Sequence, residues 1–142
     1  MAKKELDYLL ILQALKDIPF GVGKNLLVDY LKGNENDPRV VYEHSLEHNS
    51  FGTARAFESL PLFSGRSTLE GLYIQSTPTS PFVFYIESEV SKIAACPFLH
   101  RRCTTFNLEN GTKHLKLFNV QHYVALSDQV KNALKNNTEY RP

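Results

Sequence analysis

The sequence predicts an α+β protein, with a helical hairpin at the amino terminus followed by a compact mixed α/β domain that contains a small sheet. Three observations predict this. Apolar residues first recur at helical spacing, and after residue 38 short apolar runs alternate with turn residues. The composition, 42% hydrophobic and 22% charged, is typical of a globular chain. A length of 142 residues suffices for one ordinary domain, or for a small module joined to one.

Two helices are predicted in the first segment. The helix over residues 8–18 is indicated by apolar side chains that share one helical face, namely Tyr8, Ile11, Leu12, Leu15 and Ile18. Pro19 and the glycines within residues 21–23 are expected to end it. A second apolar stripe predicts a helix over residues 24–32, with Gly33 just after its end. The polar residues 34–38 then link the hairpin, residues 1–33, to the α/β domain, residues 34–142.

The remainder alternates between strand and helix patterns. Short β-type runs predict strands over residues 39–43, 72–75, 82–87 and 120–126. Helical patterns occur over residues 54–60, 110–118 and 128–135, and Ser127 is placed to cap the last of these helices. A strand could follow Tyr140.

Charge and hydropathy exclude several classes of function. A net charge of +1 gives no bulk electrostatic reason to bind nucleic acid or an anionic membrane. The longest apolar runs, residues 8–12 and 81–86, are far shorter than the roughly 20 residues that span a bilayer. No small-residue cleavage site follows the first apolar segment, so the chain as given is expected to stay in the cytosol.

The two cysteines allow two kinds of site. Cys96, His100 and Cys103 have a spacing that could hold zinc, with His114 or His122 as a fourth ligand. A Cys96–Cys103 disulfide closing a small loop, or two free thiols, is the competing interpretation.

A second zinc motif lies after the first strand of the domain. His44, Glu47 and His48 fit the H-x-x-E-H spacing of inverzincin proteases, in which two imidazoles on one helical face hold zinc and the glutamate acts as base. The flanking sequence lacks a long helix, so exposed loop histidines are the alternative. No cofactor other than zinc is suggested.

Candidate binding residues fall into two further groups. Arg101 and Arg102 follow His100 in a compact basic cluster that could meet a phosphate, or could be a solvated loop. Glu58, Arg66 and Glu70 interrupt an apolar, glycine-containing segment. They could bind sugar hydroxyls, or an Arg–Glu pair could tie a loop to the sheet.

Aromatic side chains could add to such a sugar site. Tyr73 or Tyr85 could stack on a sugar ring if it lies on the exposed face of its strand, and on the other face it would belong to the core.

Long ordered strings then indicate a relationship. RVVYEH (residues 39–44), residues 51–73, TPTSPFVFY (residues 77–85) and HLKLFNVQHYV (residues 114–124) resemble polytopic membrane proteins of archaea and bacteria, the 6-pyruvoyl-tetrahydropterin-synthase-related group. That group is similar to glycosyltransferases that use lipid-linked sugars, and the likeness covers about residues 39–140. It implies an extracytoplasmic α/β domain beside a membrane part. The acidic residues of glycosyltransfer lie in that membrane part, so none is carried over here.

The amino-terminal segment resembles a different family. ILQALKDIPFGVGKNLLVDYLKG (residues 11–33) is similar to the start of the winged-helix module of RecQ-type helicases, and this likeness covers two helices.

The sequence therefore favours a non-catalytic accessory or interaction domain, a fragment related to membrane proteins of glycan or lipid-linked sugar handling. Its expected partners are a transmembrane part and a glycan or lipid-linked sugar. A DNA-associated winged-helix-like protein is the alternative, and a zinc-dependent enzyme or zinc-stabilised domain is the third hypothesis.

Overall fold

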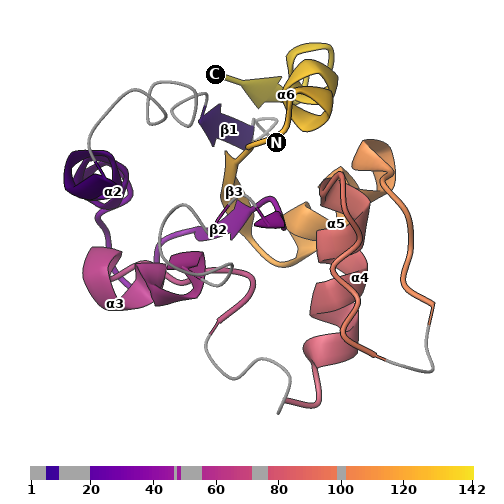
Figure 1. Ribbon diagram of the computed structural model, residues 1–142, viewed down its shortest axis with the longest axis horizontal. Helices are drawn as coiled ribbons and strands as arrows, with labels where there is room; N and C mark the ends of the chain where they lie inside the picture. Colours follow the sequence, from indigo (N-terminus) through magenta and orange to yellow (C-terminus); the bar gives the residue numbers. More distant parts are fainter. Residues whose placement is uncertain (1–5, 10–19, 47, 49–55, 72–76, 99–101) are drawn as a thin grey trace.

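The computed structural model describes residues 6–9, 20–46, 48, 56–71, 77–98 and 102–142. It is a mixed α/β structure, which confirms the predicted fold class (Figure 1). A parallel sheet of four strands runs in the order β2-β3-β1-β4, with β1 at Leu6–Leu9, β2 at Arg39–Tyr42, β3 at Val120–Val124 and β4 at Tyr140–Arg141. Helices cover both faces of this sheet, as expected where every neighbouring pair is parallel.

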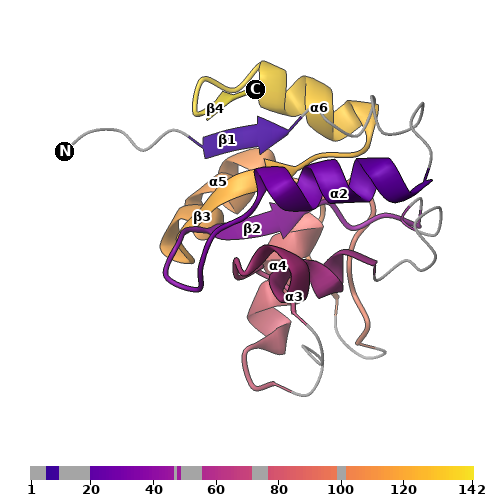
Figure 2. The same cartoon turned by 90° about the vertical axis from the view of Figure 1, so that its left-hand side faces the viewer.

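The helices divide between the two faces. On one face lie α2 (Phe20–Tyr30), the 3₁₀ helix η2 (Ala56–Ser59) and α3 (Leu60–Ser64). On the other face lie α4 (Ser80–Val90), α5 (Leu108–Leu117) and α6 (Asp128–Lys135). In the view turned by 90°, α2 lies in front of the sheet and α6 lies beside β4 (Figure 2).

Two apolar clusters form the core, one on each face of the sheet. Neighbouring strand residues divide between them, because successive side chains point to opposite faces. Val41 and Tyr123 pack with α4, α5 and α6, whereas Val40 and Val124 pack with Leu27 of α2. The strand signal seen in the sequence is therefore the signal of a sheet covered on both sides.

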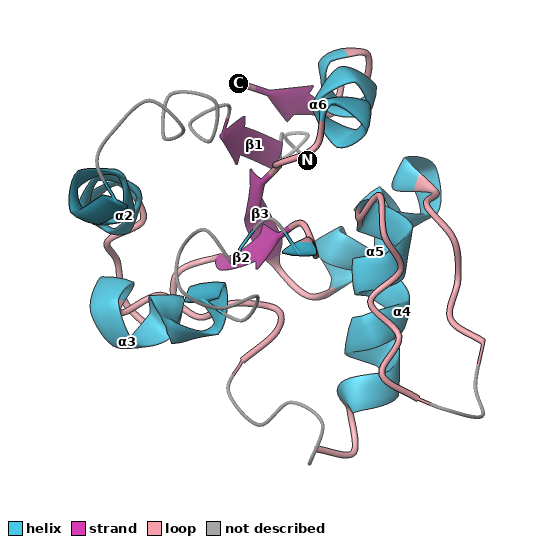
Figure 3. Ribbon diagram, in the orientation of Figure 1, coloured by secondary structure: helices cyan, strands magenta, loops and turns pink. Residues whose placement is uncertain are grey.

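Two predicted elements are wrong. Residues 6–9 form β1, so the helix expected over residues 8–18 does not begin there, and its residues 10–19 lie outside the described part. Residues 82–87 belong to helix α4, not to a strand (Figure 3). Pro81 occupies the first turn of α4, where its missing N–H costs nothing, and the helix is buried on most sides. A continuous apolar run cannot distinguish such a helix from a buried strand.

Other predictions agree with the structure. The strands β2 and β3 and the helices α5 and α6 appear close to their predicted bounds, and Oγ of Ser127 caps α6 by accepting a hydrogen bond from the Val130 N–H at 3.3 Å. Helix α2 begins at Phe20, so the glycines expected to form a turn lie inside it. The strand expected over residues 72–75 lies outside the described residues.

The described part of the first 33 residues packs with the rest of the chain. Strand β1 lies between β3 and β4 in the sheet, and Leu27 and Leu31 of α2 belong to the same core cluster as Tyr42. The two segments separated by the predicted linker thus share one sheet and one core cluster.

Glu43 joins three elements at the end of β2. Its buried carboxylate accepts hydrogen bonds from the N–H groups of Leu126 and Ser127, both at 2.7 Å, and from the Ser127 hydroxyl at 2.6 Å. It also accepts one from the Lys92 N–H at 3.3 Å, just after α4. The carboxylate therefore ties β2 to the start of α6 and to the end of α4.

Two glycines allow the ends of α2 and α3 to meet. Gly65 ends α3 with a φ of 74°, and a Cβ atom placed on it would lie 2.6 Å from the Gly33 carbonyl oxygen. The Gly33 N–H donates to the Ser64 carbonyl oxygen at 2.9 Å. Only glycine fits at position 65 without strain.

Within the described residues, no helix has the length and apolar character that would cross a bilayer. The longest of them, α2 and α4, have 11 residues each.

Candidate functional site

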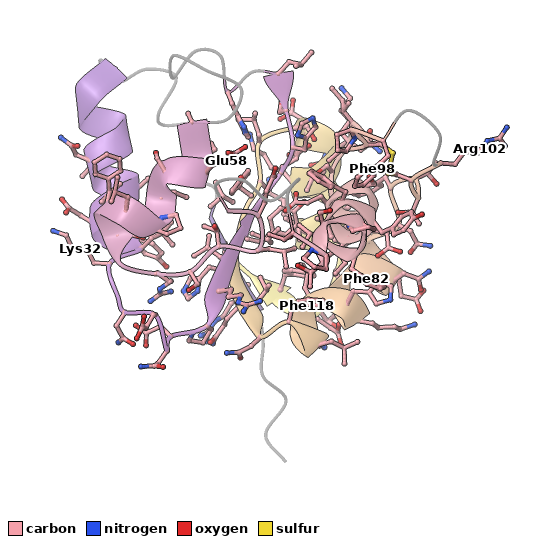
Figure 4. The ribbon with its side chains drawn as sticks, turned by 90° about the horizontal axis from the view of Figure 1, so that it is seen from below. Lys32, Glu58, Phe82, Phe98, Arg102 and Phe118 are labelled. Atoms are coloured by element: carbon pink, nitrogen blue, oxygen red, sulfur yellow. A yellow bond between two sulfur atoms is a disulfide. The ribbon has the colours of Figure 1, made fainter. Side chains whose placement is uncertain are left out.

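A groove between α4 and α5 is the candidate site. Its volume is about 460 Å³. The lining residues come from α4, from α5 and from the segment before α5, and they are Phe82, Tyr85, Ile86, Glu89, Thr104, His114, Leu117 and Phe118. Figure 4 shows Phe82 and Phe118 on the same side of the molecule. Mostly apolar walls with a few polar groups, in a volume of this size, are typical of small-ligand sites.

Helix α4 builds one wall through its helical spacing. Residues 82, 85, 86 and 89 recur at intervals of three and four, so they share the face that borders the groove. Phe82 is 62% exposed at the rim. Val83 and Val90 are buried in the core cluster on the sheet side of the helix. A single helix therefore serves both the core and the groove.

One polar pair lies in this apolar groove. The Glu89 side chain is largely buried and its Oε2 lies 2.6 Å from Nδ1 of His114, whose side chain is 44% exposed. The two residues sit on facing helices that approach closely at Gly111, where an added Cβ would lie 2.5 Å from Cγ1 of Val90. The carboxylate and the imidazole can therefore offer hydrogen bonds to a polar group of a ligand that enters between aromatic walls.

A disulfide-closed loop supports the wall formed by α4. Cys96 and Cys103 form a disulfide with their Cα atoms 5.7 Å apart. Phe98, inside this loop, packs edge-to-face on Phe84 with ring centroids 5.6 Å apart. Thr104, the residue after the loop, donates from Oγ1 to the Tyr85 carbonyl oxygen at 2.8 Å. Of the interpretations of the two cysteines, the structure shows the disulfide, which removes both sulfurs from metal ligation.

Three buried glutamates, Glu58, Glu70 and Glu87, form an acidic cluster around Tyr42 of β2. All three side chains are at most 7% exposed. The Tyr42 hydroxyl donates to Oε2 of Glu70 at 3.3 Å. Burial raises the pKa of Tyr42, and the charges of Glu70, Glu87 and Glu58 raise it further. The tyrosine therefore remains protonated and can donate to the cluster throughout the physiological range.

The predicted binding residues separate in the structure. Glu58 and Glu70 both act on the buried Tyr42, whereas Nη1 of Arg66 lies 2.9 Å from Nδ1 of His122 on β3. Arg102 is exposed and points away from the body of the protein (Figure 4). Tyr73, His100 and Arg101 lie outside the described residues.

The two histidines of the predicted inverzincin motif lie in different environments. His48 is 1% exposed and packs against the rings of Phe57 and Tyr42, with centroids 4.6 and 6.0 Å away. Burial lowers the pKa of His44, whose backbone N–H donates to the Ser91 hydroxyl at 2.8 Å. Glu47 lies outside the described residues. In the described part of the chain, no group of three or more His, Cys, Asp or Glu side chains could hold a metal ion.

The sequence reasoning missed most of the groove. It considered Tyr85 as a sugar-stacking residue and His114 as a zinc ligand, but Glu89, Thr104 and Phe118 were not singled out. The signal that could have found them is the 3-4 spacing of residues 82, 85, 86 and 89, hidden by the strand prediction for residues 82–87.

In the described residues, the fold and the groove together define a mixed α/β structure whose apolar groove contains a polar pair. A family model described as a domain of unknown function, DUF8559, matches residues 23–142, and the chain belongs to this family. No curated protein and no solved structure matches the chain. The match begins inside α2 and includes all residues of the predicted α/β domain.

Proposed function

We propose that the chain is a non-catalytic binding domain that holds the sugar of a glycan or lipid-linked sugar in the groove between α4 and α5. The observation that carries the proposal is the Glu89–His114 pair inside otherwise aromatic and aliphatic walls. A sugar ring has apolar C–H faces and a rim of hydroxyls. Such a ring can lie against Tyr85 and Phe82 while its hydroxyls bond to the polar pair.

Three features support a binding role over a catalytic one. Glycoside hydrolysis generally needs two carboxyl groups on either side of the bond that is cleaved. Among the described residues that line the groove, Glu89 is the one carboxylate, and the imidazole of His114 already pairs with it. The resemblance to membrane proteins also assigns the transfer chemistry to a separate membrane part.

The disulfide supports a location outside the cytoplasm. Disulfides persist in oxidising compartments and are rare in the reducing cytosol. The Cys96–Cys103 bond therefore favours the extracytoplasmic side, where the family resemblance also puts this region. We propose a transmembrane partner there, to which the domain presents its bound sugar.

The experiment is calorimetric titration of the protein with a panel of neutral mono- and disaccharides and with a short-chain prenyl phosphate. Tyr85→Ala should weaken saccharide binding about fivefold, because an aromatic contact contributes about 1 kcal/mol. Tyr30→Ala is the matched control, since Tyr30 is an exposed tyrosine on α2, on the other face of the sheet. Binding of the prenyl phosphate alone would indicate a lipid site. Failure of every saccharide to bind, or equal losses in both variants, would overturn the proposal.

A further inference from the structure

Glu87 is a fully buried carboxyl group without a hydrogen-bond partner. It lies in α4, on the side of the helix that faces the sheet, and it is 0% exposed. Both of its carboxyl oxygens are buried, and neither has a hydrogen-bond partner. Burying a charged carboxylate without partners is so costly that such a group is expected to keep its proton instead.

The titratable groups around Glu87 come from several elements. Glu70 lies beside it in the segment after α3, Tyr42 approaches from β2, and Tyr123 approaches from β3. Glu58 of η2 completes the cluster through its effect on Tyr42. Burial, and then the negative charge of Glu70, raise the pKa of Glu87. Within the part of the chain that the structure describes, these neighbours are acidic or neutral, and no positive side chain contributes to the shift.

We infer that the buried Glu87 carboxyl, which has no hydrogen-bond partner, is a proton-operated switch that controls how tightly α4 packs against the sheet, and through α4 the shape of the groove on its other side. With its proton in place, Glu87 is a neutral group that the core can hold. Loss of that proton puts an unpartnered negative charge between α4 and the sheet, and the cost of burying this charge favours looser packing of α4.

The link to the groove is the geometry of α4. Glu87 lies between Ile86 and Glu89 in the sequence, and both of these residues line the groove. A shift of α4 therefore changes its packing against the sheet and the groove wall at the same time. The effect on packing stands independently of any ligand. The effect on ligand affinity rests on the proposed function of the groove.

The sign of the pH dependence follows from proton linkage. The unfolded chain releases the Glu87 proton above about pH 4.3, whereas the folded protein retains it to higher pH. Unfolding therefore releases a proton in this window, and stability falls as pH rises through it. The contribution of one proton is an increase of about tenfold per pH unit in the unfolding equilibrium constant.

The test compares urea unfolding of the full chain at pH 5, 6, 7 and 8 for wild type and Glu87→Gln. Glutamine resembles the protonated acid, so the variant should lose the increase of about tenfold per pH unit that Glu87 contributes in this window. Glu35→Gln, at an exposed glutamate, is the matched control and should keep the wild-type slope. Equal slopes in wild type and Glu87→Gln would overturn the inference. Carbon-13 NMR titration of the Glu87 carboxyl in the wild type provides a second readout that needs no variant, and ionisation of that carboxyl below pH 5 would also overturn it.

The groove is monitored separately with N-phenyl-1-naphthylamine, a dye that fluoresces in apolar sites. Its affinity should change between pH 5 and pH 8 in wild type and stay constant in Glu87→Gln. Identical behaviour of the two proteins would overturn the coupling to the groove. If no saccharide binds while the unfolding slopes differ as expected, the proposed function fails and the switch stands.

Discussion

The two sides of α4 each carry a glutamate, one without a hydrogen-bond partner and one paired with a histidine. On the sheet side, Glu87 is fully buried and both of its carboxyl oxygens lack a partner. On the groove side, only two residues along the chain, Glu89 lies 2.6 Å from the His114 imidazole. The difference shows that helical phase decides which of two nearby glutamates faces the sheet and which faces the groove, where it finds a partner.

A third glutamate sharpens the comparison. Glu43 is as buried as Glu87, yet its carboxylate accepts hydrogen bonds from three backbone N–H groups and one hydroxyl. Hydrogen bonds to a carboxylate favour its charged form. Burial is therefore not what distinguishes Glu87 from Glu43; the distinction lies in the donors that surround each group.

The largest effect is expected at Glu43. Glu43→Ala leaves the Leu126 and Ser127 N–H groups and the Ser127 hydroxyl without their acceptor. Each orphaned buried donor costs about 1–3 kcal/mol, so the free energy of unfolding should fall by about 3 kcal/mol or more. Urea unfolding followed by circular dichroism measures it. A loss below that of Ser127→Ala would contradict the role of Glu43 as the joint between β2, α4 and α6.

The disulfide should come next. Replacing both cysteines, Cys96→Ser with Cys103→Ser, opens a loop of sequence separation 7. The loop-entropy relation gives a loss of about 2 kcal/mol for a loop of this length. The groove should also weaken, because the loop supports Phe84 and Tyr85 of α4. Unfolding and dye affinity are measured in parallel, and unchanged dye affinity would show that the loop does not support the groove wall.

A smaller effect is expected at the cap of α6. Ser127→Ala removes the hydroxyl that accepts from the Val130 N–H and donates to Glu43. Caps of this kind contribute about 1 kcal/mol. Ser127→Asp, which restores an acceptor at the cap but brings a second carboxylate to Glu43, is the comparison. If Ser127→Asp recovered the full stability, the hydrogen bond from the Ser127 hydroxyl to Glu43 would not contribute to the loss.

The last comparison distinguishes the two sides of α4 by the sign of the effect, not by its size. At pH 8, Glu87→Gln should stabilise the protein, because it removes the cost of burying an unpartnered acid with a raised pKa. Glu89→Gln should destabilise it by less than about 1 kcal/mol, since the lost pair is partly exposed. Parallel thermal unfolding of the two variants measures this. Changes of the same sign would remove the distinction between the two sides.

Two strands and two helices, β2, β3, α5 and α6, were predicted from the sequence more accurately than α4, the helix that forms one wall of the site. β2, β3, α5 and α6 follow from apolar spacing and caps such as Ser127, which are local signals. α4 could not be recognised as a helix, because nearly all of its residues are buried and the apolar run lacks a polar face. β1 was obscured in the same way by apolar residues that also fit a helical face.

The candidate site was predicted in part. Glu58 and Glu70 were singled out, and both act on Tyr42, but neither lines the groove; Glu87 of α4, which also acts on Tyr42, was not singled out. The pairing of Glu89 with His114 joins residues 25 positions apart on two helices. Such a contact cannot be predicted from a single sequence, because no local pattern around either residue indicates its distant partner.

The most direct test of the binding groove is an assigned ¹H–¹⁵N NMR spectrum of the protein titrated with a neutral disaccharide from the panel. If sugar binds between α4 and α5, the amide shifts should concentrate at Phe82, Tyr85, Ile86, Glu89, Thr104, His114, Leu117 and Phe118. Shifts concentrated instead on the exposed apolar residues of α2 and α3, Leu26, Tyr30, Leu62 and Phe63, would contradict the account, as would a spectrum that does not change.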